Sequence, residues 1–448
     1  MDLYGYIIVT ISKLLKAHGQ VGIITSNSWL GTIVGDTFVT ALREFFNIKQ
    51  VHISGKDKWF HNADVIGTII LLEKKSTQQR NDTLFYLWEK NLEEFESNSE
   101  WENKLVNSSL LEKEIDSNVV KVSRYSSEQI DILKHMNLSY NSFFHNVNWL
   151  LDIANKTIDI DEAFDVIRGS RRGWDKMFYP DSGHGIEQKY LHKVLRSAKS
   201  VKRLVTNADS DAFCCGKSIH ELETEGSVGT IRWIKNFETQ VNGKGEKLPT
   251  VLARKGMHWY ELQTNEIVDI FTTMNPDKRL FFAKFQKPSF INQRLIGLKA
   301  KVEYKDVELE HALLNSVFTM FYIEASGFGR GLGALDIRKE SIAKCKMLNP
   351  KLITAKDRNN ILKAFAPLLK RDIKTVREEL ASEDRMVFEK TIMKAYGIEK
   401  YLASMIYSLL SMQNTRLSAK KTIAPLDPDN LYGYQDISLV AKTAQPYM

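Results

Sequence analysis

Four side chains near the middle of the chain are suited to contact a nucleic acid. Arg168, Arg171, Arg172 and Trp174 occur within seven consecutive positions. A guanidinium group can hold a phosphate through two parallel hydrogen bonds, or bond two atoms on the edge of a guanine. These residue types at this density therefore indicate contact with a phosphate backbone or with base edges.

The four residues belong to a longer basic block. Residues 166–206 contain ten Lys or Arg and three acidic residues, whereas residues 76–150 contain seven basic and twelve acidic residues. Basic charge concentrated in one segment of a chain with a net charge of +7 is typical of a surface that contacts a polyanion. The residues of this block that we predict to contact DNA are Arg168, Arg171, Arg172, Trp174, Lys176, Lys193 and Arg196. The competing interpretation is a basic helix face that contacts only solvent.

A further arginine stands in a glycine-rich stretch, GFGRGLGALDIRK, in which Arg330 lies between Gly329 and Gly331. Glycine lets a backbone approach a ligand closely, so the arginine could enter a DNA groove, and we predict that all three residues contact DNA. A nucleotide-binding loop is the alternative. Such a loop requires a strand before the glycines, whereas residues 309–324 have the pattern of a single helix.

Two other groups of reactive side chains are weaker candidates for a functional site. One is a fragment of a metal-dependent nuclease pattern, Pro180, Asp181, Glu187 and Lys189. The carboxylates of that pattern sit on adjoining strands, and five intervening residues leave too little chain for a turn and strand pairing. The other group is Cys214 and Cys215 with His220, which do not supply four zinc ligands at a usual spacing. We expect buried structural thiols there and no metal site.

The first 75 residues alternate between helical and strand patterns, which predicts an α/β fold. Residues 21–25 are a continuous apolar run, as in a central parallel strand that is buried on both sides. Two further strands are expected at residues 48–54 and 65–73, and Trp59 and Phe60 stand among polar residues between them. These aromatic residues either cover a cleft or pack in the core. The first helix places its apolar residues on one face: Ile7, Ile8, Ile11, Leu14 and Leu15.

The rest of the chain divides by composition. Residues 1–75 precede an acidic connector at 76–150, an irregular α+β region at 151–345, a helical region at 346–417 and a polar tail at 418–448. The apolar runs are too short to cross a bilayer, no secretory leader is visible, and three cysteines do not make a disulfide framework. We therefore expect a cytoplasmic protein without membrane contact.

The first 75 residues resemble the C-terminal part of the catalytic domain of adenine-N6 DNA methyltransferases, in particular the Taq-type enzymes and the large restriction–modification proteins of the same layout. The matching segments are DLYGYIIVTISKLLKAHGQVGIITSNSWL, LREFF and WFHNADVIGTIILLEK. Further along, IRGSRRGWDKMFYP, AFCC and EASGFGRGLGALDIRK look like the target-recognition region of that family. The resemblance implies the C-terminal half of a doubly wound methyltransferase sheet, then an irregular target-recognition domain and a helical C-terminal region.

The resemblance also implies that essential parts are absent. The family binds S-adenosylmethionine on a glycine-bearing turn and holds the target adenine with an Asn-Pro-Pro-Tyr motif. Both lie upstream of the segment that matches DLYGY, and the first proline of this chain is Pro180. We therefore expect a missing N-terminal half to bind most of the cofactor, and this chain alone to be inactive. Phe60 matches the aromatic residue that stacks on the flipped-out adenine in the family, and Trp59 is its neighbour.

Two functions follow from these expectations. In the first, the chain is part of a site-specific adenine-N6 DNA methyltransferase in restriction–modification or phage defence, and it supplies target-base stacking and sequence recognition. In the second, it is a non-catalytic DNA-recognition subunit that works with a separate catalytic chain. Double-stranded DNA is the ligand in both, and a chain carrying the catalytic half is a candidate partner. A third interpretation is an α/β protein whose basic block has no function.

Overall fold

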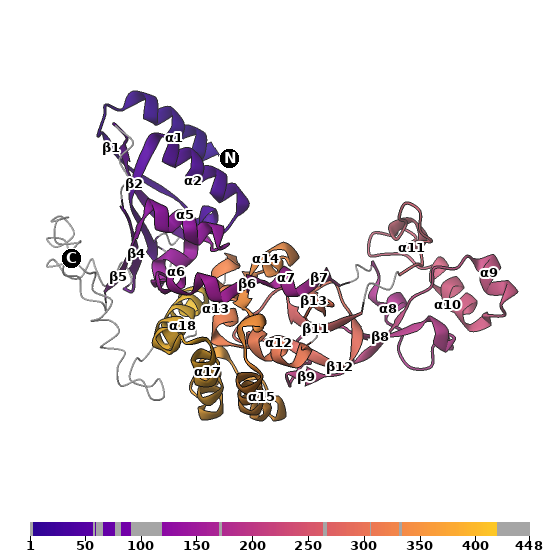
Figure 1. Cartoon of the computed structure of the whole chain (residues 1–448). Helices are drawn as coiled ribbons and strands as arrows, with labels where there is room; N and C mark the ends of the chain where they lie inside the picture. Colours follow the sequence, from indigo (N-terminus) through magenta and orange to yellow (C-terminus); the bar gives the residue numbers. More distant parts are fainter. Residues whose placement is uncertain are drawn as a thin grey trace.

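The computed structural model describes residues 3–56, 59, 66–76, 82–90, 119–169, 173–262, 267–304, 306–330 and 334–418. Figure 1 shows a sheet at the N-terminal end, a central region that includes the C-terminal helices, and a lobe of residues 173–262 at the opposite end. The predicted fold class, α/β followed by α+β and a helical C-terminal region, is confirmed.

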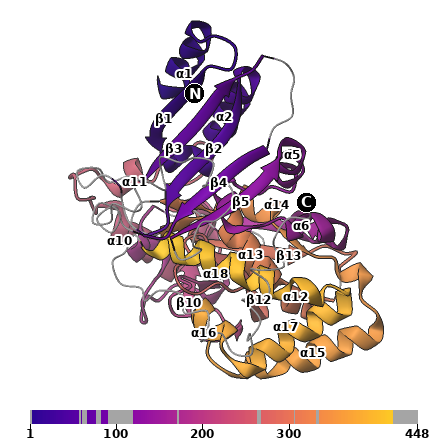
Figure 2. The ribbon, with the colours of Figure 1, turned by 90° about the vertical axis from the view of Figure 1, so that its left-hand side faces the viewer.

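The N-terminal sheet has five strands in the order β1-β3-β2-β4-β5 (Figure 2). The strands β1, β2 and β4 run in one direction, while β3 and β5 run antiparallel to their neighbours. The strand bounds are β1 (Gln20–Ser26), β2 (Phe46–Ser54), β3 (Gly67–Lys74), β4 (Asp82–Trp88) and β5 (Val120–Ser126). One face of this sheet packs against the helices α1 (Leu3–Leu14), α2 (Ile33–Phe45) and α5 (Ser127–His135).

Side-chain caps determine where these helices begin. The Thr32 hydroxyl accepts a hydrogen bond from the Gly35 amide at 3.2 Å and so caps α2. Ser126 and Gln129 form a capping box at the start of α5. At Gly35 a Cβ atom would lie 1.7 Å from the Trp29 carbonyl oxygen, so only glycine allows α2 to begin this close to the preceding turn.

The prediction that residues 21–25 form a central strand buried on both sides is wrong. Among the described strands β1 pairs with β3 alone, in antiparallel orientation, and Ile24 is 61% exposed. The apolar face predicted for the first helix is only partly correct, because Ile8 is buried whereas Ile7 and Leu14 are 51% and 81% exposed. An apolar run shows that a strand can be buried, but it does not reveal whether a neighbour is present to bury it.

The central region is built on a seven-stranded sheet with the order β10-β8-β12-β11-β13-β7, in which β9 also pairs with β12. Its strands are β7 (Phe164–Arg168), β8 (Leu191–Leu195), β9 (Val205–Thr206), β10 (Ser210–Phe213), β11 (Val268–Thr273), β12 (Ala283–Ile291) and β13 (Leu295–Ala300). Two antiparallel pairs are added: β6 (Thr157–Asp159) with β16 (Lys346–Leu348), and β14 (Phe328–Arg330) with β15 (Ala334–Asp336). The helices are α6 (Trp149–Ile153), α7 (Ile160–Ala163), α12 (Val307–Leu314), α13 (Val317–Ser326) and α14 (Lys339–Lys344).

The single helix predicted for residues 309–324 is in fact the two helices α12 and α13. Asn315 ends α12, and its side-chain amide donates to the carbonyl oxygens of Phe282 and His311 at 2.8 and 2.9 Å. Ser316 then caps α13 with its hydroxyl. These side-chain bonds replace helical backbone bonds, and apolar residues on both sides conceal the break in the sequence pattern.

The lobe of residues 173–262 has an apolar core of its own, to which buried Phe178, Phe213 and Phe237 contribute. Strands β8 and β10 connect it to the seven-stranded sheet. Its helices are α8 (Asp175–Phe178), α9 (Ile219–Thr224), α10 (Val228–Glu238) and α11 (Leu248–Val251). Short helices and strands of this kind agree with the irregular α+β character expected for this part of the chain.

The helical character predicted for the C-terminal region is confirmed. The helices are α15 (Ala355–Lys370), α16 (Val376–Leu380), α17 (Glu383–Tyr396) and α18 (Leu402–Ser418). In α18, Arg416 Nε donates to the Glu324 carboxylate of α13 at 2.9 Å, and the Ser418 hydroxyl donates to the Gly55 carbonyl oxygen at 3.1 Å. Helix α18 therefore connects the N-terminal sheet to the central region.

Glu310 of α12 makes the stability of the fold dependent on pH. The residue is 1% exposed, and burial, with the nearby charges of Asp306 and Asp269, raises its pKa from 4.5 to about 8. The folded chain therefore keeps a proton that the unfolded chain releases. The stability contributed by this proton is complete below pH 4.5 and is lost as the pH rises through about 8.

We expect Glu310→Gln to remove this dependence. Its free energy of unfolding should exceed that of the natural chain by roughly 2–4 kcal/mol at pH 8, and the two values should converge below pH 5. Urea unfolding followed by circular dichroism at several pH values measures both curves. Parallel curves for the two proteins would show that Glu310 does not titrate in this range.

Candidate nucleic-acid interface

Asn292, in the turn between β12 and β13, is a point at which three elements meet. It is 2% exposed. Its backbone amide donates to the Leu195 carbonyl oxygen at the end of β8 (3.1 Å), and its side-chain amide donates to the Tyr179 hydroxyl (3.0 Å) just after α8. Its carbonyl oxygen accepts the Leu295 amide at 2.8 Å and closes the turn. The turn is therefore fixed against both β8 and the lobe.

The end of β7 packs against the same turn. The Arg168 Nε atom donates to the Gln293 carbonyl oxygen at 3.5 Å. At the next residue, Gly169, a Cβ atom would lie 2.0 Å from the Asn292 carbonyl oxygen. Only glycine permits so close an approach of two backbones, so the chain leaves β7 directly beside Asn292.

Arg168, Arg196 and Arg294 form what we call the arginine cluster. Arg196 follows β8, and its guanidinium group lies 4.9 Å from the centre of the Tyr179 ring. The Arg294 backbone amide donates to the Asn292 side-chain oxygen at 3.2 Å. All three arginines are exposed. The three arginines thus come from three separate elements whose backbones meet beside one buried residue, and their exposed guanidinium groups are suited to phosphate groups or guanine edges.

The two lysines predicted for this interface differ in their surroundings. Lys193 Nζ lies 2.9 Å from an oxygen of Asp211, across the pairing of β8 with β10, so part of its charge is already neutralised. Lys176 is exposed on α8. The Asp209 carboxylate accepts a hydrogen bond from the Arg196 backbone amide at 3.2 Å. The Arg196 guanidinium group lies over the Tyr179 ring.

The other residues that the sequence predicts to contact DNA or the target base lie outside the arginine cluster. Trp174 is half-buried against the core of the lobe, and its indole nitrogen is buried without a hydrogen-bond partner among the residues that the structure describes. Gly329 and Arg330 belong to β14, which pairs with β15. The following predicted residues lie outside the described part of the chain: Phe60, Arg171, Arg172 and Gly331.

Sequence reasoning did not select Arg294 or Asn292, because both lie far outside the basic block. A usable signal was present. The polar residues Asn292, Gln293 and Arg294 separate two apolar runs of strand type, which is the pattern of a hairpin turn. What the pattern does not show is that this hairpin lies beside the ends of β7 and β8.

Trp59 packs against Tyr86, Trp88 and Val120 on the N-terminal sheet. His52 stacks on Tyr86 with ring centres 4.4 Å apart, and the Trp88 indole N–H donates to the His52 Nδ1 atom at 3.2 Å. Burial lowers the pKa of His52 to about 4, so its imidazole is neutral at pH 7. These contacts correspond to the core-packing alternative for Trp59.

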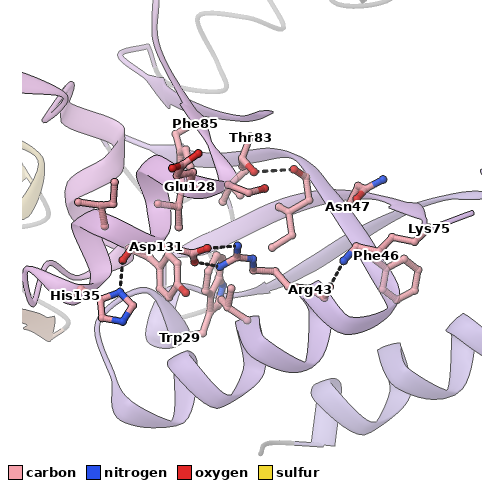
Figure 3. A pocket seen from close by; sticks show the side chains of 17 residues that line it. Trp29, Arg43, Phe46, Asn47, Lys75, Thr83, Phe85, Glu128, Asp131 and His135 are labelled. Carbon is pink, nitrogen blue, oxygen red and sulfur yellow. Dashed lines mark hydrogen bonds and ion pairs between the residues drawn. The ribbon is translucent and has the colours of Figure 1, made fainter. Parts of the chain in front are cut away.

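Figure 3 shows a cavity of about 480 Å³ between α2, α5 and the N-terminal sheet. Arg43 of α2 donates to both carboxylate oxygens of Asp131 of α5, at 2.5 and 3.1 Å, and Lys75 donates to the Arg43 carbonyl oxygen. Trp29 and Phe85, each 2% exposed, belong to its apolar lining. Because Arg43 and Asp131 neutralise each other and hold α5 onto α2, we assign the cavity a structural role.

The carboxylate of Glu187, a residue of the nuclease-like fragment, caps the first turn of α10. Its carboxylate accepts the Gly229 and Thr230 amides at 2.8 Å each, and the Thr230 hydroxyl at 2.5 Å. Burial acts to raise the pKa of Glu187, but the hydrogen bonds from Thr230 and Gly229 outweigh it and hold the pKa below its ordinary value. Lys189 pairs with Glu225 at 3.0 Å. The fragment therefore serves the local fold.

All three cysteines are buried in the described part of the chain. Cys214, Cys215 and Cys345 are buried free thiols, and burial, with Cys215 nearby, raises the pKa of Cys214 to about 12. Within the described residues, no group of three or more His, Cys, Asp or Glu side chains is placed to hold a metal ion. In the same part of the chain, no helix combines the length and the apolar content needed to span a membrane.

No known protein-family model matches the sequence. Among solved structures, the chain is similar to the type IIG restriction endonuclease BpuSI, with a TM-score of 0.48, 12% identity, and coverage of 94% of this chain and 50% of that one. It is also similar to the type IIL restriction-modification enzyme MmeI in complex with DNA, with a TM-score of 0.48, 12% identity, and coverage of 92% and 51%. The chain thus spans about half the length of each of these proteins.

Proposed function

We propose that the chain recognises double-stranded DNA as part of a site-specific adenine-N6 DNA methyltransferase of a restriction–modification system. The observation that carries the DNA-binding part is the arginine cluster, which three separate elements present around the buried Asn292. The methyltransferase part rests on the sequence resemblance of residues 1–75. In this proposal the central region and the lobe read the DNA sequence, and Phe60 stacks on the target base.

S-adenosylmethionine is the methyl donor in the proposed reaction. The family holds it on a glycine-bearing turn, and Gly5 does not form such a turn because it lies inside α1. The residues present therefore do not fit a complete cofactor site. We propose that a separate catalytic part supplies cofactor binding and methyl transfer, and that the residues described above supply DNA recognition.

The DNA-binding proposal predicts a strong dependence on salt. Each phosphate contact releases bound counterions, so three arginine contacts should give a slope of about −3 for log affinity against log salt concentration. Fluorescence anisotropy of a labelled duplex at a series of salt concentrations measures this slope. No binding at low salt, or an affinity that salt leaves unchanged, would contradict the proposal.

An alternative is a non-catalytic recognition subunit that works with a separate catalytic chain, and the edge of the N-terminal sheet favours it. The outer edge of β1 has no partner among the described strands. Ile24 of β1 is 61% exposed, and Tyr6, Ile7 and Leu14 of the preceding helix α1 are 51–81% exposed. An unpaired strand edge with apolar side chains is a template for a strand from another polypeptide.

The nucleotides upstream of Met1, read in all frames, distinguish the two candidates. An encoded cofactor turn and Asn-Pro-Pro-Tyr motif, in phase or one frameshift away, would support one methyltransferase interrupted at this point. The same motifs in a separate neighbouring gene would support the recognition subunit. Absence of both motifs from the locus would leave the methyltransferase proposal without its catalytic half and would argue against it.

A further inference from the structure

The outer side of the α15–α17 pair carries an open groove of about 650 Å³. The two helices pack through Phe365 and Phe388, whose ring centres are 4.9 Å apart. Toward the groove, α15 contributes Ala364 and Pro367, and α17 contributes Val387, which is 52% exposed. These side chains are too small to fill the space between the two helices, which leaves the groove open. Because they are apolar, the floor of the groove is apolar as well.

The rim of the groove is rich in lysine. Lys363 and Lys394 line it, and both are exposed. Helical spacings of three, four or seven residues place further exposed lysines on the same two helix faces. These are Lys356, Lys370 and Lys390. None of the five lysines forms an ion pair with another described residue.

The carboxylates on these two helices do little to balance the lysines. Asp384 binds Arg371 at 2.6 Å, and Asp357 accepts the Thr354 hydroxyl at 2.7 Å. Glu383, at the N-terminal end of α17, is exposed and lines one end of the groove. The two helix faces beside the groove therefore carry five exposed lysines, of which Lys363 and Lys394 line it, and the exposed carboxylate of Glu383 lies at one end.

We propose that this groove binds an amphipathic helix of a partner protein, with its acidic residues along the lysines and its apolar residues over Val387. The channel between two packed helices has the shape that a third helix requires. Binding of phosphate groups alone would not need an apolar floor, which favours a polypeptide over duplex DNA. A second copy of this chain is disfavoured because its five lysines would face the five lysines of the first.

The inference does not depend on the proposed DNA-binding function, because the groove shares no residue with the arginine cluster. Glu383 also offers a contact for a basic residue of the bound helix. Its acidic segment would lie over Lys363 and Lys394, and a basic residue at its other end would lie near Glu383.

The probe for this proposal is a fluorescein-labelled helical peptide in which leucines recur every three or four residues and glutamates flank them. Anisotropy with the full chain should show saturable binding. The double variant Lys363→Glu/Lys394→Glu, and separately Val387→Asp, should each weaken binding by at least about tenfold. Lys244→Glu, an exposed change in the lobe, is the matched control and should leave binding unchanged. A peptide of the same composition in scrambled order should not bind.

Several outcomes would overturn the proposal. Equal binding of the scrambled peptide, or undiminished binding by both groove variants, would exclude a helix site. Displacement of the peptide by duplex DNA, with weaker DNA binding by the lysine variant, would assign the groove to nucleic acid. Self-association of the natural chain that Val387→Asp abolishes, measured by light scattering, would assign it to a second copy. Circular dichroism verifies folding, and Lys363→Gln/Lys394→Gln replaces any charge-reversal variant that unfolds.

Discussion

Replacing Arg385 by alanine is expected to lower the free energy of unfolding by about 3–5 kcal/mol, because it leaves a buried carboxylate without its cation. Arg385 is 1% exposed, and its Nη2 atom lies 2.7 Å from an oxygen of Glu389, which is 0% exposed. The Glu389 carboxylate also accepts the Val317 backbone amide at 2.9 Å. The pair therefore joins α17 to the start of α13. Urea unfolding at pH 7, followed by circular dichroism, measures the change.

Two matched variants separate charge burial from packing. Arg385→Met combined with Glu389→Leu removes both charges and keeps similar volume, so it should be clearly more stable than Arg385→Ala. Glu389→Gln keeps an acceptor for the Val317 amide and should cost less than Arg385→Ala. If Arg385→Ala and the double variant are equally destabilised, the loss comes from packing, and the unpaired carboxylate is not its cause.

Replacing all three residues of the arginine cluster by alanine is expected to weaken binding to duplex DNA by about 100-fold near physiological salt. The slope of log affinity against log salt concentration should become less negative by about 3, because three phosphate contacts are lost. Anisotropy titrations with the same duplex give both quantities. Lys13→Ala serves as the control, because this exposed lysine lies on α1, outside the predicted interface, and should change binding little.

Asn292→Ala tests whether the placement of the arginines matters as well as their charge. This variant keeps all three guanidinium groups but removes the hydrogen bond to Tyr179 and the acceptor for the Arg294 amide. We expect affinity to fall while the salt slope changes less than in the triple variant. Normal affinity in a folded Asn292→Ala protein would show that the arginines do not need this turn to hold them.

The sequence predicts short-range structure well where the determining residues are neighbours. Helix α5 begins at Ser127 because Ser126 and Gln129, three residues apart, form its capping box. The break between α12 and α13 was not predicted, because it depends on bonds from Asn315 to Phe282, a residue 33 positions earlier in the chain. Caps are encoded locally, whereas a side chain that ends a helix by bonding a distant strand is not.

The candidate site illustrates the same limit. The basic block identified Arg168 and Arg196, but their proximity depends on Asn292, which lies about 100 residues further along the chain. Arg294 joins them only because a hairpin closes beside β7 and β8. Charge counts locate a segment that can contact a polyanion, while the geometry of the contact is determined by pairing between strands that are distant in sequence.

Helix α18 restricts relative motion between the N-terminal sheet and the seven-stranded sheet. Its Arg416 is bonded to Glu324 beside the central sheet, and its Ser418 is bonded to Gly55 at the end of β2. Arg416 and Ser418 are only two residues apart at the C-terminal end of α18, so a single helical turn holds both bonds. The two sheets therefore cannot separate at this point without breaking one of these bonds. In a DNA complex of the proposed kind, this turn would be the place where any rotation of one sheet against the other is resisted.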